Sequence, residues 1–265
     1  MRLCKLKHIV TTNFLSFHLV LICIAFIDLN SGLAQIDSSI KFDNQEDTIK
    51  ITKNQLILPV SLLGFGVAGT VYKEFKGVNL EIREEVNEHV TQKFALDNTI
   101  QYVPMSSVYA LNAFGVRGKH NFVDRTVILA SAATTMIITT QLLKRWTHVQ
   151  RPDGSTFNSF PSGHTATAFV GAEFVYQEYK DVSIYYGLSA YAIAAGTGFL
   201  RIYNNRHWVT DVAAGAGIGI LCTKFSYWIF PKIKNLLGIK NQKTQSFIIP
   251  NVSISEKGMT FMLRF

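Results

Sequence analysis

The chain has 265 residues, of which 48% are hydrophobic and 17% charged, and its formal net charge is +8. This composition is apolar for a soluble globular protein, so it favours a membrane protein or a very helical core. The basic residues do not form a run, which excludes a typical nucleic-acid-binding protein and leaves a lipid surface or a phosphorylated substrate as the expected anionic partner.

The first 34 residues have the features of an export signal. Basic residues are followed by the short apolar stretch LVLICIAFI (19–27) and by small residues that would permit cleavage after Ala34. The alternative is an uncleaved first membrane helix, for which the stretch is short. Two of the three cysteines lie in this segment and leave only Cys222, so the sequence predicts neither an internal disulfide nor a cysteine metal cluster.

After a polar linker predicted over 35–55, apolar runs and apolar periodicity predict a series of helices. They are expected at 56–72, 77–94, 103–116, 126–143, 165–176, 183–200 and 212–230. The second is charged and amphipathic, and the last three are rich in glycine and alanine, which allows helices to pack closely. Several approach the roughly 20 residues that span a bilayer. Glu173 and Lys224 interrupt two of them, so a soluble all-α bundle is the alternative.

A basic segment and a tail follow over 236–265. In SFIIPNVSIS and GMTFMLRF, apolar and polar residues partly alternate around a glycine-containing turn at 256–258, which predicts a β-hairpin. The expected fold is therefore an all-α antiparallel helical bundle over 56–235, embedded in a membrane, with a small C-terminal β-hairpin.

The stretch FPSGHTATAF (160–169) places a histidine at a predicted helix start. Pro161 disfavours helix before it, and Ser162 is a good N-cap. Gly163 and His164 would lie in the first turn, whose backbone N–H groups and dipole bind anions such as phosphate. His164 could then give a proton to the group that carries the anion. The alternative is a capped helix with an incidental histidine.

Cations follow two of the predicted helices. Lys144 and Arg151 are seven residues apart and would share one face if the helix continued that far. Arg201 ends the helix at 183–200. Such residues are ordinarily solvated helix ends, but they could instead hold an anion.

His207 and Asp211 are four residues apart, which on a helix brings a carboxylate beside an imidazole. The carboxylate would fix the tautomer of the ring and make the other nitrogen a nucleophile. A surface His–Asp pair is the alternative. A metal site is disfavoured, because Lys144, Arg151 and Arg201 would surround the metal with positive charge.

All of these groups lie in the connections that flank one antiparallel helix pair, so they are expected at one end of the bundle. KRWTHVQRP, PSGH and RIYNNRHWVTD resemble, in order and spacing, the three motifs of the type 2 phosphatidic acid phosphatase family. That family also includes bacterial acid phosphatases and vanadium haloperoxidases. The resemblance covers about residues 57–230.

The resemblance implies a role for each motif residue. His207 attacks phosphorus, Asp211 orients His207, and His164 protonates the leaving oxygen. Phosphate would be bound by the remaining motif residues: Lys144, Arg151, Ser162, Gly163 and Arg201. The family usually has a serine where this chain has Leu200, which removes one possible hydrogen bond from the site.

The function implied is removal of phosphate from a lipid through a phosphohistidine, with no cofactor and no metal. The substrate classes are a phosphatidate, an isoprenoid diphosphate, a phosphatidylglycerol phosphate or a lipid A. The partners are the phosphorylated lipid and the membrane, with no nucleic acid and no predicted oligomeric state. The alternatives are a soluble exported acid phosphatase, a vanadate-dependent haloperoxidase and a non-enzymatic anion-binding protein.

The expected location is the bacterial inner membrane with the active site facing the periplasm, or the periplasm itself for a soluble enzyme. In the membrane arrangement, the chain is expected to cross inward at 56–72, to remain on that side over 77–116, and to cross outward at 126–143. Lysines in 231–243 would then lie inside, as the positive-inside rule requires. The alternative is a crossing by 103–116, which would invert everything after it.

Overall fold

A computed structural model describes residues 51–89, 93, 95–239, 251–255 and 258–262. They belong to one compact unit, Thr48–Phe265. The export signal expected over 1–34 and most of the linker expected over 35–55 lie outside the described residues. So does much of the expected basic segment, residues 240–250.

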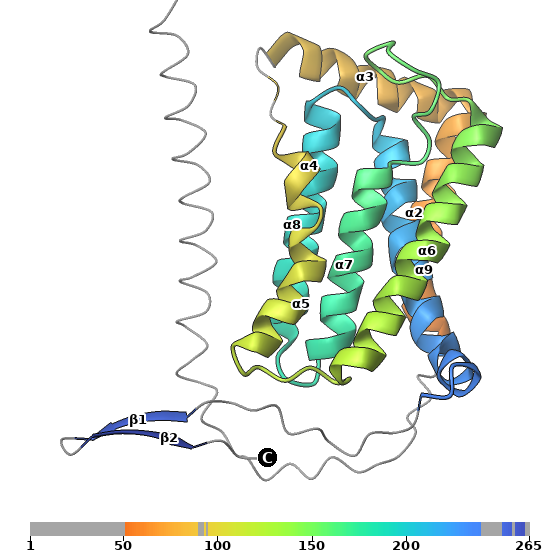
Figure 1. Cartoon of the computed structure of the whole chain (residues 1–265). Coiled ribbons are helices and arrows are strands. Elements are labelled where there is room, and N and C mark those ends of the chain that lie inside the picture. The colour runs from red at the N-terminus through yellow and green to blue at the C-terminus, as the bar shows by residue number, and fades with distance from the viewer. Residues whose placement is uncertain (1–50, 90–92, 94, 240–250, 256–257, 263–265) are drawn as a thin grey trace, which may run out of the picture. The chain divides into compact units, whose positions relative to one another are not determined.

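The bundle expected from the sequence is confirmed (Figure 1). Its helices are α2 (Lys53–Val71), α3 (Lys73–His89), α4 (Asp97–Ile100), α5 (Val103–Ala113), α6 (Phe122–Thr147), α7 (Gly163–Tyr179), α8 (Ile184–Tyr203) and α9 (Val209–Leu236). The tail contains an antiparallel hairpin of β1 (Asn251–Ser255) and β2 (Gly258–Met262), in which Asn251 pairs with Met262 and Ser255 with Gly258.

Helix α7 is the buried centre of the bundle and packs against α5, α8 and α9. Two glycines of α9 permit a close approach to it. A Cβ at Gly215 would lie 2.5 Å from the Ser162 carbonyl oxygen, and one at Gly219 would lie 2.5 Å from the Ala166 carbonyl oxygen. Because α9 comes this close, the backbone N–H of Ser162 donates to the Asp211 carbonyl oxygen at 3.0 Å. Glycine content thus places the starts of α7 and α9 beside each other.

In the part of the chain that the structure describes, α2, α4 with α5, α6, α7, α8 and α9 each run between the two ends of the bundle (Figure 1). Helix α2 is antiparallel to α9, because Gly69 lies against Thr210 and Pro59 against Gly217. The stretch 97–113 runs from Arg201 at one end to Tyr179 at the other.

This path corrects the expected crossing pattern. Residues 77–116 were expected to remain on one side, but α4 and α5 together run the length of the bundle. Helix α4 has 4 residues and α5 has 11, so neither is long enough to be recognised in the sequence as crossing the bundle. As a consequence, α2 ends, rather than begins, at the end of the bundle where α7 and α9 start.

Among the described residues, three helices are long and apolar enough to cross a membrane: Lys53–Val71, Phe122–Thr147 and Val209–Leu236. Large apolar side chains of α2 and α6 are exposed: Ile57, Leu58, Val60, Ile137 and Ile138. A bilayer covers apolar surfaces of this kind, so the long apolar helices and their exposed side chains support a membrane protein.

Helix boundaries differ from expectation at two places that matter for the site. Helix α2 begins at Lys53, inside the expected linker. Helix α6 ends at Thr147, because His148 adopts a left-handed conformation with φ 46°. Arg151 therefore lies in a loop, and the expectation that it shares a helix face with Lys144 is wrong.

Candidate active site

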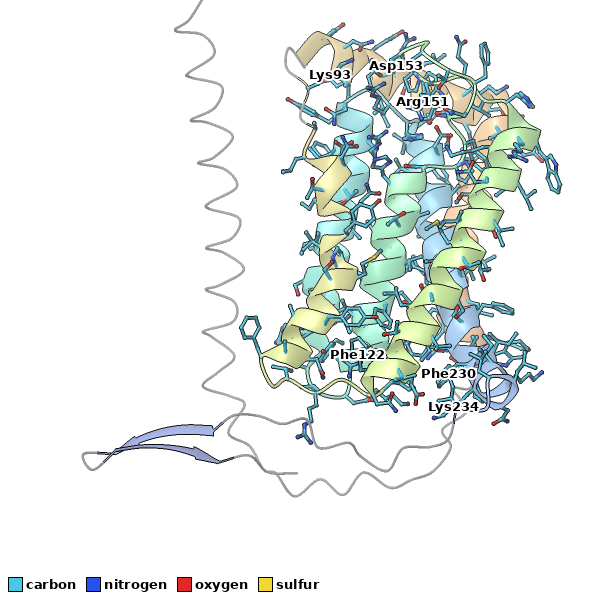
Figure 2. The ribbon with its side chains drawn as sticks, viewed as in Figure 1. Lys93, Phe122, Arg151, Asp153, Phe230 and Lys234 are labelled. Atoms are coloured by element: carbon cyan, nitrogen blue, oxygen red, sulfur yellow. The ribbon has the colours of Figure 1, made fainter. Side chains whose placement is uncertain are left out.

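A cavity of about 320 Å³ lies at the end of the bundle covered by α3. Figure 2 shows Lys93, Arg151 and Asp153 at this end and Phe122, Phe230 and Lys234 at the opposite end. The cavity is lined by Lys93, Ala95, Asp97, Asn98, Arg151, His164, Arg201, Asn204 and Arg206. Four of these side chains are cations and one is a carboxylate, so the cavity suits an anion.

The start of α7 forms one wall. Ser162 is the N-cap, as expected, and its hydroxyl oxygen lies 3.5 Å from the Thr165 backbone N–H that it accepts from. Added atoms at Gly163 would meet nothing within 4 Å, so open space borders the first turn. His164 lines the cavity, with Nε2 2.9 Å from Asn98 Oδ1. Unpaired N–H groups of a first turn beside open space are a ready anion site.

Asn158 holds two of the predicted phosphate-binding cations. Lys144 Nζ donates to the Asn158 carbonyl oxygen at 2.5 Å, and Arg151 Nε donates to Asn158 Oδ1 at 3.0 Å. The loop turns back on itself through a bond from the Arg151 backbone N–H to the Thr156 carbonyl oxygen at 2.9 Å. The two cations are thus brought together by loop hydrogen bonds, not by a shared helix face.

Arg201 lies near the end of α8 and is buried, with 6% of the residue exposed. Its Nη1 donates to the Asp97 carboxylate, which is also buried. At the rim of the cavity, Arg206 Nη1 donates to Asp153 Oδ2 at 3.1 Å. Both arginines therefore have a carboxylate partner in the absence of a bound anion.

His207 and Asp211 face each other, with 3.6 Å between Nδ1 and Oδ2. His207 precedes α9 by two residues, so a turn and not a helix brings the pair together. Ser159 lies between them: its Oγ donates to Asp211 Oδ2 and lies 3.5 Å from His207 Nδ1. Since Ser159 has one O–H proton and gives it to the carboxylate, its oxygen accepts from His207 Nδ1. Nδ1 therefore carries the ring proton, and the lone pair of Nε2 is available to attack.

Burial lowers the pKa of His207 from 6.5 to about 4. The Asp211 carboxylate opposes this change, and the positive charges of Lys144 and Arg201 add to it. The imidazole is therefore neutral at neutral pH, which is the protonation state a nucleophile requires. His207 is 2% exposed and does not line the cavity, so an anion must approach it past the surrounding cations.

The residues described here contain no group of three or more histidine, cysteine, aspartate or glutamate side chains that could hold a metal ion. Positive charge at the site is supplied by side chains of the protein itself.

The structure brings all of the predicted site residues to one end of the bundle. It also adds four that the sequence analysis missed: Asp97, Asn98, Asn158 and Ser159. Asp97 and Asn98 are separated from their partners by 104 and 66 residues, and no spacing rule connects them. Ser159 is close to the PSGH motif, but a serine in a loop carries no signal of its own.

Residues 125–235 match the model of the PAP2 superfamily. A lipid A 1-phosphatase of Porphyromonas gingivalis is 39% identical over 137 residues, which is 51% of this chain and 30% of that protein. The bacitracin transport permease protein BcrC of Bacillus licheniformis is 33% identical over 97 residues, which is 36% of this chain and 45% of that protein. This chain thus spans less than half the length of either curated relative.

Two solved structures are similar. Aquifex aeolicus LpxE is 24% identical, with a TM-score of 0.42, and the match covers 56% of this chain and 94% of that chain. The PAP2-type phosphatidylglycerolphosphate phosphatase of Bacillus subtilis is 24% identical, with a TM-score of 0.47, and the match covers 69% of this chain and 98% of that chain.

The matched residues 125–235 include all three motifs and the side chains of Lys144, His164 and His207 that meet at the cavity end. Over residues 125–235, the chain is therefore similar to the PAP2 superfamily.

Proposed function

We propose that this chain removes phosphate from a membrane lipid through a phosphohistidine intermediate and without a metal ion. The observation that carries the proposal is how the imidazole of His207 is held. Its Nδ1 lies 3.5 Å from Ser159 Oγ and 3.6 Å from Asp211 Oδ2, so Nε2 is the nitrogen that can attack, in the field of Lys144 and Arg201. This is the nucleophile-and-orienter arrangement of covalent catalysis.

In the first step, Nε2 of His207 attacks phosphorus while the bond from phosphorus to the leaving oxygen breaks. His164, which lines the cavity, takes up a proton from the incoming phosphate monoanion and gives it to that oxygen. Lys144, Arg151, Arg201 and the first N–H groups of α7 stabilise the charge on the three equatorial oxygens. Asp211 stabilises the imidazolium that forms as His207 shares its lone pair.

In the second step, water attacks the phosphorus of phosphohistidine and the P–N bond breaks. His164, now neutral, takes a proton from that water. Inorganic phosphate leaves and His207 returns to its neutral state, so the cycle needs no oxidant, reductant or cofactor.

A lipid substrate is supported by the surface around the cavity. Aromatic side chains are exposed at this end of the bundle: Trp146 is 75% exposed, Phe157 60% and Phe199 61%. Amphipathic aromatic residues gather at the level of lipid headgroups, which is where a phosphate ester of a lipid lies. The relative from Porphyromonas gingivalis, a lipid A 1-phosphatase, adds support for a lipid over a soluble ester.

We further propose that the cavity faces the periplasm of a bacterial inner membrane. Cations outside the site lie at both ends of the bundle: α3 and Arg145 contribute them at the cavity end, and a larger set lies at the opposite end, namely Lys53, Arg117, Lys119, Lys180, Lys232 and Lys234. Four of the lysines in the chain lie in 231–243, after the last crossing. The positive-inside rule favours the cytoplasm for that end and the periplasm for the cavity.

The test is release of inorganic phosphate by the detergent-solubilised protein. The panel should contain a phosphatidate, a phosphatidylglycerol phosphate, an isoprenoid diphosphate, a lipid A and a water-soluble phosphate ester. We expect kcat/KM for at least one lipid to exceed that for the soluble ester, and an acid-labile phosphoenzyme that is absent from His207→Ala. Preference for the soluble ester would favour the acid phosphatase. Halide oxidation with added vanadate, without phosphate release, would favour the haloperoxidase.

A further inference from the structure

The short helix α4 contacts two residues of the proposed mechanism through consecutive side chains. Asp97 accepts from Arg201 Nη1, and Asn98 Oδ1 lies 2.9 Å from His164 Nε2. Neither Asp97 nor Asn98 belongs to the three motifs, and both lie outside the matched region 125–235. A segment from an earlier part of the chain therefore reaches the phosphate-binding arginine and the proton donor together.

The pair of Asp97 and Arg201 is deeply buried, with side-chain exposures of 2% and 7%. A guanidinium at this depth without a partner would be costly, because burial removes the water that stabilises its charge. Asp97 is the carboxylate that compensates for it. The contact also restricts the orientation of the guanidinium, because a planar group that is hydrogen-bonded through one nitrogen cannot rotate freely.

Arg201 keeps hydrogen-bonding capacity beyond this contact. Its Nε is fully buried and has no hydrogen-bond partner among the described residues. Buried donors are ordinarily satisfied, so a buried donor without a protein partner in a cavity wall is suited to bind a ligand. Since Asp97 occupies Nη1 and Arg201 lines the cavity, the N–H of Nε is available to an anion that enters it.

We propose that Asp97 is a positioning residue: it holds the Arg201 guanidinium in the orientation that binds the transferring phosphoryl group. This inference rests on the proposed phosphatase function. Asp97 acts through Arg201 and not on the substrate, because two negatively charged groups would repel each other at contact. Its removal therefore affects the transition state more than the binding of ground-state phosphate.

The variants Asp97→Ala and Asp97→Asn separate position from charge. Alanine removes the contact, and a displaced catalytic group costs about 100-fold in kcat/KM. Asparagine keeps an oxygen that can accept from Nη1 but loses the charge, so we expect a smaller loss of about tenfold. Asp181→Asn, an exposed carboxylate at the far end of α7, is the matched control and should behave as the wild type.

Inhibition constants distinguish positioning from a general loss of folded protein, because they do not depend on how much enzyme is active. We expect the inhibition constant of orthovanadate, a transition-state mimic, to rise about as much as kcat/KM falls in Asp97→Ala. The constant of inorganic phosphate should change much less. An unchanged orthovanadate constant in Asp97→Ala would overturn the proposal.

The Arg201→Ala background gives a second test. If Asp97 acts only through Arg201, adding Asp97→Ala should cause no further loss of activity. A further loss comparable to that in the wild-type background would overturn the proposal.

Failure of the phosphatase function itself would show as no phosphate release by the wild type. In that case, orthovanadate-induced thermal stabilisation of wild type against Asp97→Ala still measures whether Asp97 orients the anion site.

Discussion

Lys224 Nζ lies 2.7 Å from Glu173 Oε1, and this buried pair joins the middle of α9 to the middle of α7. Tyr191 of α8 donates to the other carboxylate oxygen, and Gln177 donates to Oε1 at 2.6 Å. In the sequence, Glu173 and Lys224 interrupt two apolar runs and count against membrane embedding. In the structure they satisfy each other inside the bundle, so neither places an unpaired charge in the bilayer.

Replacing Lys224 by methionine should destabilise the protein strongly. Glu173 is 1% exposed, and the variant would leave its carboxylate without the cation that compensates for its burial. Removing one partner of a buried pair costs about 3–5 kcal/mol. Thermal unfolding in detergent measures the change, with the exposed Lys232→Met as control. The double variant Glu173→Gln with Lys224→Met should recover part of the loss. A Lys224→Met protein as stable as Lys232→Met would contradict a structural role for the pair.

The sequence predicts most of this bundle because its information is local. Runs of apolar residues locate α6, α8 and α9, and Ser162 marks the start of α7. The motif residues meet because they flank one antiparallel helix pair, which follows from helix order alone. Both inferences use only neighbours in the chain.

The parts that the sequence did not predict depend on contacts between distant segments. Helix α4 has four residues, so it has no periodicity to detect, yet it places Asp97 against Arg201. The left-handed His148 ends α6 early, and no glycine or proline stands at that position to indicate it. The crossing by α4 with α5 was not expected, because the break between the two helices leaves no single apolar run long enough to indicate a crossing. The roles of the site residues remain predictions.

His207→Ala should abolish turnover with the fold intact, because in the proposed mechanism His207 alone forms the bond to phosphorus and His164 only transfers protons. Asp211→Asn should lower kcat by roughly 10³–10⁴-fold, since the amide no longer fixes the tautomer of His207. Initial rates of phosphate release measure both changes, and circular dichroism reports the fold. Turnover close to that of the wild type in His207→Ala would remove His207 as the nucleophile.

The pH dependence of kcat/KM should show a nucleophile that remains neutral well below pH 6.5. Burial lowers the pKa of His207 to about 4, so Nε2 keeps its lone pair as the pH falls from 7 towards 5. Below about pH 4, protonation should reduce kcat/KM about tenfold per pH unit. The profile is measured on free enzyme and corrected for ionisation of the substrate phosphate. Asp211→Asn should move the acid limb lower, because Asp211 raises this pKa. A limb that begins near pH 6.5 would contradict a buried neutral His207.

Chelation should leave activity unchanged. Charge compensation in the proposed mechanism comes from Lys144, Arg151 and Arg201, so EDTA has no ion to remove from the site. Orthovanadate should inhibit, because its trigonal-bipyramidal form resembles the transferring phosphoryl group. Dialysis against EDTA followed by phosphate-release assays, with and without added zinc or magnesium, measures this. Loss of activity that a metal restores would require His207 and Asp211 to be reinterpreted as metal ligands.

The orientation in the membrane is linked to the N-terminal segment, because α2 begins at the end of the bundle opposite the cavity. A cavity in the periplasm requires Lys53 to lie in the cytoplasm. Cleavage of an export signal after Ala34 would instead leave residues 35–52 outside, and the cavity would then face the cytoplasm. The two expectations from the sequence thus give opposite orientations, and the distribution of lysines favours the periplasmic cavity.

Cysteine labelling in intact bacterial cells decides between them, in a background whose native cysteines are replaced by alanine. Ser155→Cys marks the exposed loop at the cavity end and avoids Gly154, whose φ of 72° strains any substitution. Leu236→Cys marks the other end, where the side chain is 86% exposed. We expect an impermeant maleimide to label Ser155→Cys in intact cells and Leu236→Cys only after permeabilisation. The reverse pattern would place the cavity in the cytoplasm and favour a cleaved export signal. Labelling of both in intact cells would favour a soluble exported enzyme, since a protein that spans no membrane exposes both ends of its bundle to the same side.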